Sequence, residues 1–186
     1  MTNSPKGRAL YSRRGLLALG LPAVVAVTPL GALARTRPAR PRSLKFRHLH
    51  TGETLSTVYH ADGRYQKDGL KEINWILRDW RTDEQAAMDH RLLDLLHRLH
   101  QVMDSTEPFE IISGYRSSKT NKMLANKSRG VAKKSLHMRA MAADISLPGR
   151  DLENLYWAAR TLKRGGTGFY AKSGFIHVDC GRVRFW

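Results

Sequence analysis

Two short stretches in the C-terminal half of the chain carry side chains that could bind a metal ion. Residues 135–144 contain His137 and end in Asp144, and residues 175–179 contain His177. Two imidazoles and a carboxylate form the protein ligand set of a catalytic zinc ion, which keeps a fourth position open for water. The alternative is that these are three unrelated polar residues. Spacing alone does not decide between the two interpretations.

Local patterns place both stretches on strands. Residues 142–147 and 175–179 alternate polar and apolar side chains, which is typical of short strands. Residues two apart on a strand share a face, so we expect Asp179 to lie beside His177. Ile176 and Val178 should then point into the core.

Arg116 lies in a turn between a predicted strand, residues 109–114, and a helix predicted from about Ser118 to Lys127. The planar guanidinium can bind both oxygens of a carboxylate, so an arginine at this turn suits recognition of a carboxylate substrate. The simpler alternative is a local contact with a backbone carbonyl.

The remaining elements must position these residues. Helical spacing of apolar residues predicts helices over about 70–80, 92–103 and 151–164. Residues 44–65 are typical of a hairpin or two short strands, and residues 182–186 alternate like an edge strand. Neither internal repeats nor a second domain are indicated.

Length and composition limit the classes of protein. The 186 residues suffice for one domain plus a signal or tail, and 41% hydrophobic residues exclude a largely disordered chain. The net charge is +16, and about +12 remains without the first 34 residues. Such a surface suits an anionic polymer, whether nucleic acid, a membrane face or cell-wall material. The single cysteine, Cys180, excludes an internal disulfide and a four-cysteine zinc site.

The N-terminal residues are typical of an export signal. Arg13 and Arg14 precede an uncharged run, residues 15–34, that ends in Ala-Leu-Ala. We therefore expect a twin-arginine-type signal peptide over 1–34, a basic extended leader over 35–43 and a folded domain over 44–186. An uncleaved membrane anchor is the alternative. Either arrangement places the domain outside the cytoplasm.

Three ordered motifs carry a family resemblance: Ser-Gly-Tyr-Arg-Ser at 113–117, Ser-x-His-x6-Asp at 135–144 and Phe-Ile-His-Val-Asp at 175–179. Together they resemble the zinc D-alanyl-D-alanine peptidase (VanX-like) family, and within it the YcbK/MepK-type periplasmic murein endopeptidases. The resemblance implies an α+β fold in which a small antiparallel sheet holds one zinc and packs with about four helices.

The resemblance also implies roles for individual residues. His137, Asp144 and His177 would be the zinc ligands, and Arg116 would hold the substrate. The chain departs from the family pattern in having Ala140 where glycine is usual, and Cys180 at a position that resembles threonine elsewhere. Neither departure removes a ligand.

A zinc peptidase also needs a general base for the water proton. Several relatives have an acidic residue three positions before the last ligand, but this chain has Gly174 there. Asp179 is the first candidate, and an equally favoured role for it is to orient the imidazole of His177. His50 and Glu53 are weaker candidates.

The resemblance implies a periplasmic zinc metallopeptidase that acts on peptidoglycan stem peptides, as an endopeptidase on crosslinks. A carboxypeptidase or dipeptidase on terminal D-alanine and a non-catalytic wall-binding module are the alternatives. An exported nucleic-acid binder would explain the charge but not the clustered histidines and acids. We therefore expect one zinc per chain, no nucleic-acid partner, membrane contact only through an uncleaved signal, and a monomer.

Overall fold

The computed structural model describes residues 40–128 and 131–186. The expected signal peptide, residues 1–34, lies outside the described residues, as does the expected leader up to residue 39. The elements, in which η denotes a short 3-10 helix, are β1 (Arg42–His48), β2 (Thr54–Ala61), β3 (Arg64–Tyr65), α1 (Lys67–Ile76), α2 (His90–Val102), β4 (Phe109–Ser113), α3 (Ser118–Lys127), η1 (Leu136–Arg139), β5 (Ala142–Ser146), α4 (Leu152–Leu162), β6 (Gly166–Tyr170), η2 (Ala171–Ser173), β7 (Phe175–Asp179) and β8 (Arg184–Phe185).

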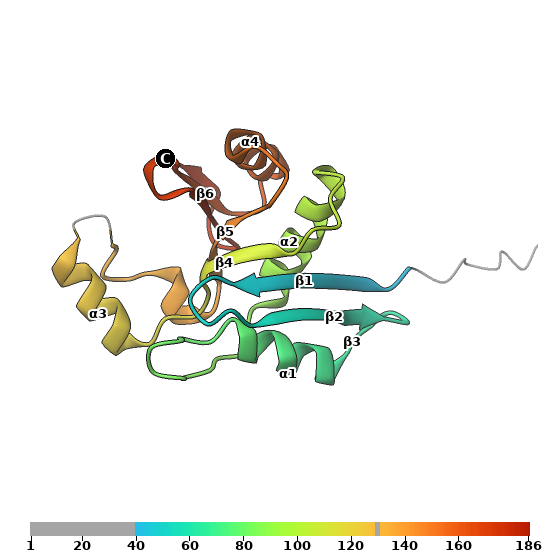
Figure 1. Ribbon diagram of the computed structural model, residues 1–186, viewed down its shortest axis with the longest axis horizontal. Coiled ribbons are helices and arrows are strands. Elements are labelled where there is room, and N and C mark those ends of the chain that lie inside the picture. The colour runs from blue at the N-terminus through green and yellow to red at the C-terminus, as the bar shows by residue number, and fades with distance from the viewer. Residues whose placement is uncertain (1–39, 129–130) are drawn as a thin grey trace, which may run out of the picture. The chain divides into compact units, whose positions relative to one another are not determined.

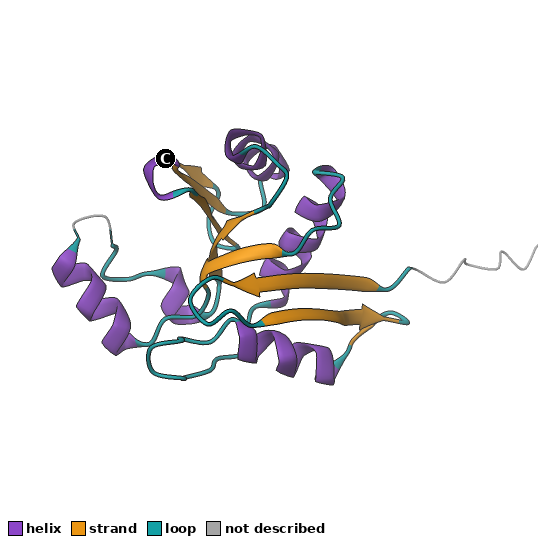
Figure 2. Ribbon diagram, viewed as in Figure 1, coloured by secondary structure: helices purple, strands orange, loops and turns teal. Residues whose placement is uncertain are grey.

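The fold is α+β, as predicted, with four α-helices in the described part of the chain (Figures 1 and 2). The prediction of a small antiparallel sheet is wrong. The described strands form one eight-stranded sheet in the order β3-β2-β1-β4-β5-β7-β6-β8. Two of its pairs, β1 with β4 and β6 with β8, are parallel, so the sheet is mixed.

The sheet is larger than predicted because the β1–β2 hairpin joins it. Helices α1 and α2 separate β3 from β4 in sequence, and such a long connection allows the chain to return parallel to β1. Phe46 of β1 pairs with Phe109 of β4, and both side chains are fully buried. Apolar burial across this pair holds the hairpin on the sheet.

Helices α2 and α4 cover one face of the sheet. Leu96 of α2 and Leu155 of α4 belong to the same buried cluster as Ile145 of β5 and Val178 of β7. Capping fixes where the two helices begin. Asp89 caps α2 by accepting a hydrogen bond from the amide of Arg91, and Asp151 caps α4 by accepting from the amides of Glu153 and Asn154. Within residues 40–128 and 131–186, none of the helices has both the length and the apolar character needed to cross a membrane.

Helix α1 ends at Ile76, before the end of the predicted stripe at Trp80. The chain turns after the C-cap residue Leu77, and Asp79 and Glu84 close the turn in an isolated bridge. The buried Asp79 carboxylate also accepts the amide of Ser117, the N-cap of α3, at 2.9 Å. This loop therefore fixes the position of the turn that carries Arg116.

Candidate metal centre

A row of paired residues crosses four neighbouring strands on the face opposite α2 and α4. Ser113 of β4 pairs with Asp144 of β5, Asp144 pairs with His177 of β7, and His177 pairs with Gly168 of β6. Ile176, which precedes His177 on β7, is fully buried on the side of the sheet that the helices cover. The period of two along each strand therefore puts Asp144 and His177 side by side on one face.

His137 reaches this row from η1. Ser135 caps the segment by accepting the amide of His137 at 3.3 Å, and Ala140 ends it in the left-handed region at φ 53°. The chain then enters β5. This turn explains the six-residue spacing between His137 and Asp144, because it folds the histidine back over the strand that carries the carboxylate.

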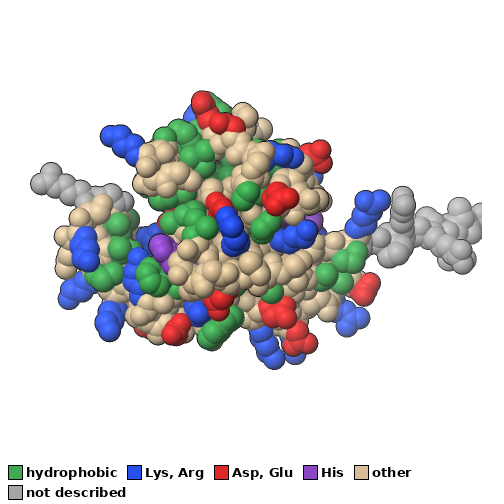
Figure 3. Space-filling model, in the orientation of Figure 1, with side chains coloured by type: hydrophobic (Ala, Val, Ile, Leu, Met, Phe, Trp, Pro, Cys, Tyr) green, Lys and Arg blue, Asp and Glu red, His purple; other side chains and the backbone are tan. Residues whose placement is uncertain are grey.

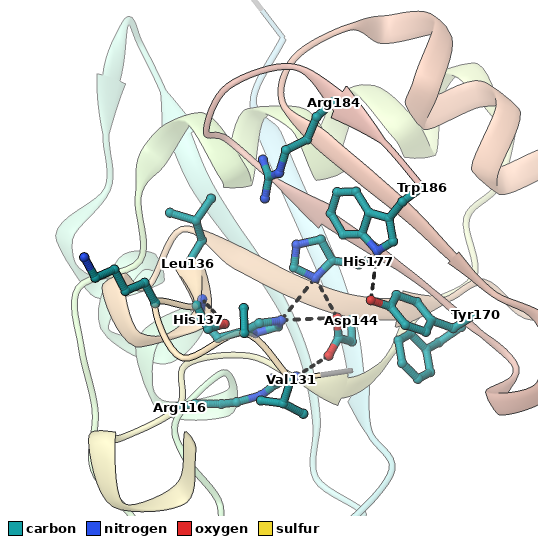
Figure 4. Close-up of a pocket in the computed structure, with 13 residues that line it drawn as sticks. Arg116, Val131, Leu136, His137, Asp144, Tyr170, His177, Arg184 and Trp186 are labelled. Carbon is teal, nitrogen blue, oxygen red and sulfur yellow. Dashed lines mark hydrogen bonds and ion pairs between the residues drawn. The ribbon is translucent and has the colours of Figure 1, made fainter. Parts of the chain in front are cut away.

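Three donor atoms converge at this point (Figure 4). Oδ1 of Asp144 lies 3.2 Å from Nε2 of His137 and 2.9 Å from Nδ1 of His177, and the two nitrogens are 3.2 Å apart. All three side chains are buried. The structure thus brings together the three residues that the sequence selected as candidate ligands.

The outer nitrogen of each imidazole is tied to an acceptor. Nδ1 of His137 lies 2.7 Å from the carbonyl of Gly114, which can only accept a hydrogen bond. Nε2 of His177 lies 3.1 Å from the Asp179 carboxylate. In the neutral form of each ring the proton therefore lies on the outer nitrogen, and the inner nitrogen presents a lone pair toward the other ring and Asp144.

The electrostatics of this cluster favour a positive charge. Burial lowers the pKa of His137, so its ring is neutral near pH 7. Burial would also lower the pKa of His177, but its hydrogen bonds to Asp144 and Asp179 outweigh burial and raise it. Burial would raise the pKa of Asp144, yet the two imidazoles hold it well below its ordinary value. A buried carboxylate beside two imidazole nitrogens is a site for a cation.

The donor set fits zinc. Two imidazole nitrogens and one carboxylate oxygen are common zinc ligands. Tetrahedral bonds of about 2.0–2.1 Å would separate such ligands by roughly 3.3 Å, close to the observed separations of 2.9 to 3.2 Å. In such an arrangement His137 would offer Nε2, His177 Nδ1 and Asp144 Oδ1.

Arg116 binds the other oxygen of Asp144. Its Nη2 contacts Oδ2 of Asp144, and its Nε donates to Oγ of Ser113 at 2.8 Å. Gly114 allows this turn to pack closely, because a Cβ there would overlap the Leu77 carbonyl. The side chain of Arg116 thus braces Asp144, a role that the sequence did not indicate. Nη1 makes no hydrogen bond to the described residues, and Arg116 is one of the residues that line the pocket.

Asp179 is fully buried behind His177. Its carboxylate accepts hydrogen bonds from the amides of Gly166 and Gly181 at 2.9 and 2.8 Å, and pairs with Arg184 at 2.7 Å. Burial would raise the pKa of Asp179, but His177, Arg184 and these amides hold it far below its ordinary value. Its predicted place beside His177 is confirmed.

A pocket of about 400 Å³ opens over the three donor atoms (Figure 4). The cations Arg116, Lys134 and Arg184 line it, and Asp144 is its one acidic side chain within the described residues. His50 and Glu53 do not line it, and Glu53 pairs instead with Arg78 at 2.8 Å.

The far wall of the pocket is aromatic. Tyr170, Phe175 and Trp186 form it, and sequence reasoning selected none of them. A signal was present, because Arg184 and Trp186 alternate along an expected edge strand two residues apart. What the sequence could not indicate is that β8 lies beside β6 and therefore beside the site.

Comparison with known proteins identifies the family. A family model described as "Peptidoglycan L,D-endopeptidase MepK" matches residues 36–186. The chain belongs to the MepK family. It is 41% identical over 176 residues to the peptidoglycan L,D-endopeptidase MepK of Escherichia coli (strain K12), covering 94% of this chain and 97% of that protein. It is 36% identical over 173 residues to the probable MepK of Haemophilus influenzae, covering 92% and 91%.

The resemblance stated from the three motifs is therefore confirmed. No solved structure was found to match the chain. Relative to the family pattern inferred from sequence, Ala140 adopts φ 53°, a conformation that glycine takes more easily. Cys180 is buried, and burial raises the pKa of its thiol to about 11, so it is a packed residue. Neither departure disturbs the three donor atoms.

Proposed function

We propose that this MepK-family chain is a zinc metallopeptidase that hydrolyses amide bonds in peptidoglycan stem peptides and cleaves peptide crosslinks. The observation that carries the proposal is the convergence of one nitrogen each from His137 and His177 on Asp144, with both outer nitrogens already bonded. Family membership adds the reaction class, since the matched relatives are named as peptidoglycan L,D-endopeptidases.

We assign the ligand roles to His137, Asp144 and His177, with one zinc ion per chain. When bound, zinc supplies Lewis-acid activation of water and of the scissile carbonyl. The protein's own part is orientation. Gly114 fixes the ring of His137, Asp179 fixes the ring of His177, and Arg116 fixes the Asp144 carboxylate.

Of the two roles open for Asp179, we propose orientation of His177. The carboxylate lies on the outer side of the ring and is absent from the pocket lining, so it would reach a water in the pocket only through the imidazole. Arg116 retains the substrate role implied by the family. Its Nη1 is available to a carboxylate or to a carbonyl oxygen that gains charge.

The pocket chemistry supports a stem-peptide substrate. Arg116, Lys134 and Arg184 supply positive charge for peptide carboxylates, and the aromatic wall supplies apolar contact. The relatives' names specify L,D bonds, and we propose the same bond type here, with the bond between two diaminopimelates as the leading choice. A carboxypeptidase or dipeptidase acting on terminal D-alanine is the alternative, since the same cations would bind a chain-terminal carboxylate.

We further propose that the protein acts in the periplasm as a monomer and reaches it by the twin-arginine route. Residues 1–34 would be the signal, and the leader expected over 35–43 would end before Arg42, because Arg42 and Ser43 belong to β1 and so to the peptidase domain. On the face in Figure 3, Lys and Arg side chains lie over much of the surface with acidic side chains among them, and such a positively charged surface suits an anionic matrix such as the cell wall. Membrane contact would occur only through an uncleaved signal.

Two measurements on the purified mature protein test the proposal. We expect about one equivalent of zinc, and conversion of crosslinked muropeptide dimers into monomers. A zinc content near zero would support a non-catalytic wall-binding module. Release of free D-alanine from monomers, with dimers left intact, would support the carboxypeptidase instead.

A further inference from the structure

Tyr170 and Trp186 form a hydrogen-bonded pair in the pocket wall, and neither residue has a role in the function proposed above. Nε1 of Trp186 donates a hydrogen bond to the hydroxyl of Tyr170 at 2.9 Å (Figure 4). Indole N–H groups only donate, so the phenol oxygen is the acceptor in this contact. The phenol proton therefore remains available to a second partner, and none of the described residues accepts it.

Several contacts fix the indole of Trp186. A Cβ at Gly168 would lie only 2.5 Å from Cε2 of Trp186, so the glycine leaves the space that the indole fills. The backbone of Trp186 is bonded on both sides to β6, with its amide 3.2 Å from the Thr167 carbonyl and its carbonyl 3.0 Å from the amide of Phe169. The ring also lies against His177, with centroids 5.4 Å apart.

The phenol ring of Tyr170 is held as well. It stacks on Phe175 with centroids 4.8 Å apart and an interplanar angle of 22°. Tyr170 follows Gly168 by two residues on β6, and Gly168 pairs with His177, so the Tyr170 side chain lies on the face that carries Asp144 and His177. Figure 4 shows the phenol directed into the pocket toward that pair.

We propose that Tyr170 is a catalytic hydrogen-bond donor to the oxygen of the scissile carbonyl, and that Trp186 is the residue that positions it. The phenol keeps its proton throughout and stabilises the oxygen as negative charge develops there. Trp186 occupies one acceptor position of the hydroxyl and so limits the directions that the O–H can take. This inference rests on the proposed function, because it requires an amide bond to be cleaved in this pocket.

The experiment compares Tyr170→Phe, Trp186→Phe and the double variant on purified muropeptide dimers, with zinc content measured for each. We expect kcat of Tyr170→Phe to fall by roughly 10²-fold, as for loss of one oxyanion donor, with KM and zinc content close to wild type. Trp186→Phe should lower kcat less, and it should add nothing in the Tyr170→Phe background, because the two residues act through one hydroxyl.

Tyr156→Phe is the matched control, because Tyr156 belongs to α4 on the helical face, and its activity should equal wild type. Unchanged kcat in Tyr170→Phe, or a change in KM alone, would overturn the donor role and leave an aromatic binding wall. Additive effects of the two substitutions would overturn the positioning role of Trp186. Wild-type protein that leaves dimers intact would instead refute the proposed function, and the inference with it.

Discussion

Asp179 and Asp144 lie on opposite sides of the His177 imidazole. Nε2 of His177 is 3.1 Å from Oδ2 of Asp179, and Nδ1 is 2.9 Å from Oδ1 of Asp144. One carboxylate thus fixes which nitrogen carries the proton, and the other faces the lone pair of the remaining nitrogen. Asp179 is itself held by Arg184 and by two backbone amides. Arg184 therefore fixes Asp179, and Asp179 fixes the orientation of the His177 ring.

Replacement of Asp179 by Asn separates orientation from base catalysis. If Asp179 orients His177, Asp179→Asn should weaken zinc binding by roughly 10- to 100-fold, the usual cost of losing such a partner. Competition with a chromogenic chelator measures this affinity. Unchanged zinc affinity together with a large fall in kcat would favour the general-base role.

The proposed ligands predict a simple pattern of metal content. His137→Ala, Asp144→Ala and His177→Ala should each lose bound zinc and activity, because three protein donors are needed to hold a catalytic zinc. Metal analysis and circular dichroism of the purified variants check content and folding. His90→Ala, at an exposed histidine, is the control. Full zinc occupancy in any one of the three would exclude that residue as a ligand.

Arg116 should matter more for catalysis than for metal content. Arg116→Ala is expected to lose most activity, on the order of 10²-fold, while zinc still binds at saturating metal, because all three ligands remain. Arg116→Lys should rescue little of it, because one ammonium cannot reproduce the fork that binds Ser113 and Asp144 together. The control is Arg64→Ala at an exposed arginine of β3. Full activity in Arg116→Lys would mean that only the charge is required.

The buried His48 predicts loss of stability in mild acid. The pKa of His48 is lowered from 6.5 to about 4, mainly by burial and secondly by the charge of the neighbouring His50. Above pH 6.5 the His48 ring is neutral in both the folded and the unfolded protein. Between pH 6.5 and 4 the unfolded chain binds a proton that the folded chain does not, so the free energy of unfolding should fall by about 1–3 kcal/mol.

Urea unfolding at several pH values measures this dependence. His48→Asn should flatten the curve between pH 6.5 and 4, whereas His90→Asn, at an exposed site, should leave it unchanged. An identical pH dependence in His48→Asn and wild type would assign the acid sensitivity to other groups.

The export signal is tested by a substitution that preserves charge. Replacing Arg13 and Arg14 together with lysine should leave precursor in the cytoplasm if the twin-arginine route is used. Cell fractionation and the size of the product report the outcome. Normal export of this variant would assign the protein to the general secretory route.

Local patterns predicted the site better than they predicted the sheet. The strands that carry Asp144 and His177 and the helix Ser118–Lys127 follow from alternation and helical spacing, which are local properties. The pairing of Phe46 with Phe109 joins residues far apart in sequence, and no local pattern records such a pairing. The eight-stranded sheet was therefore not predictable from these signals.

The same limit explains which pocket residues were missed. His137 and Asp144 could be selected because their side chains are chemically distinctive and lie in one short segment. Tyr170 and Trp186 are aromatic residues, a type that occurs throughout protein cores, so their identity alone does not indicate a site. Only the pairing of β6 with β8 brings them together. The brace from Arg116 to Asp144 likewise depends on β4 lying beside β5.

The cross-strand row has a consequence for the kinetics of folding. His177 is separated from His137 by 40 positions, and these residues meet only after β5 has paired with β7. Long-range strand pairing is generally slow, because the entropy of closing the intervening chain is lost before contacts form. The three donor atoms would then assemble late, and the rate of zinc uptake by refolding protein would follow completion of the sheet rather than diffusion of the metal.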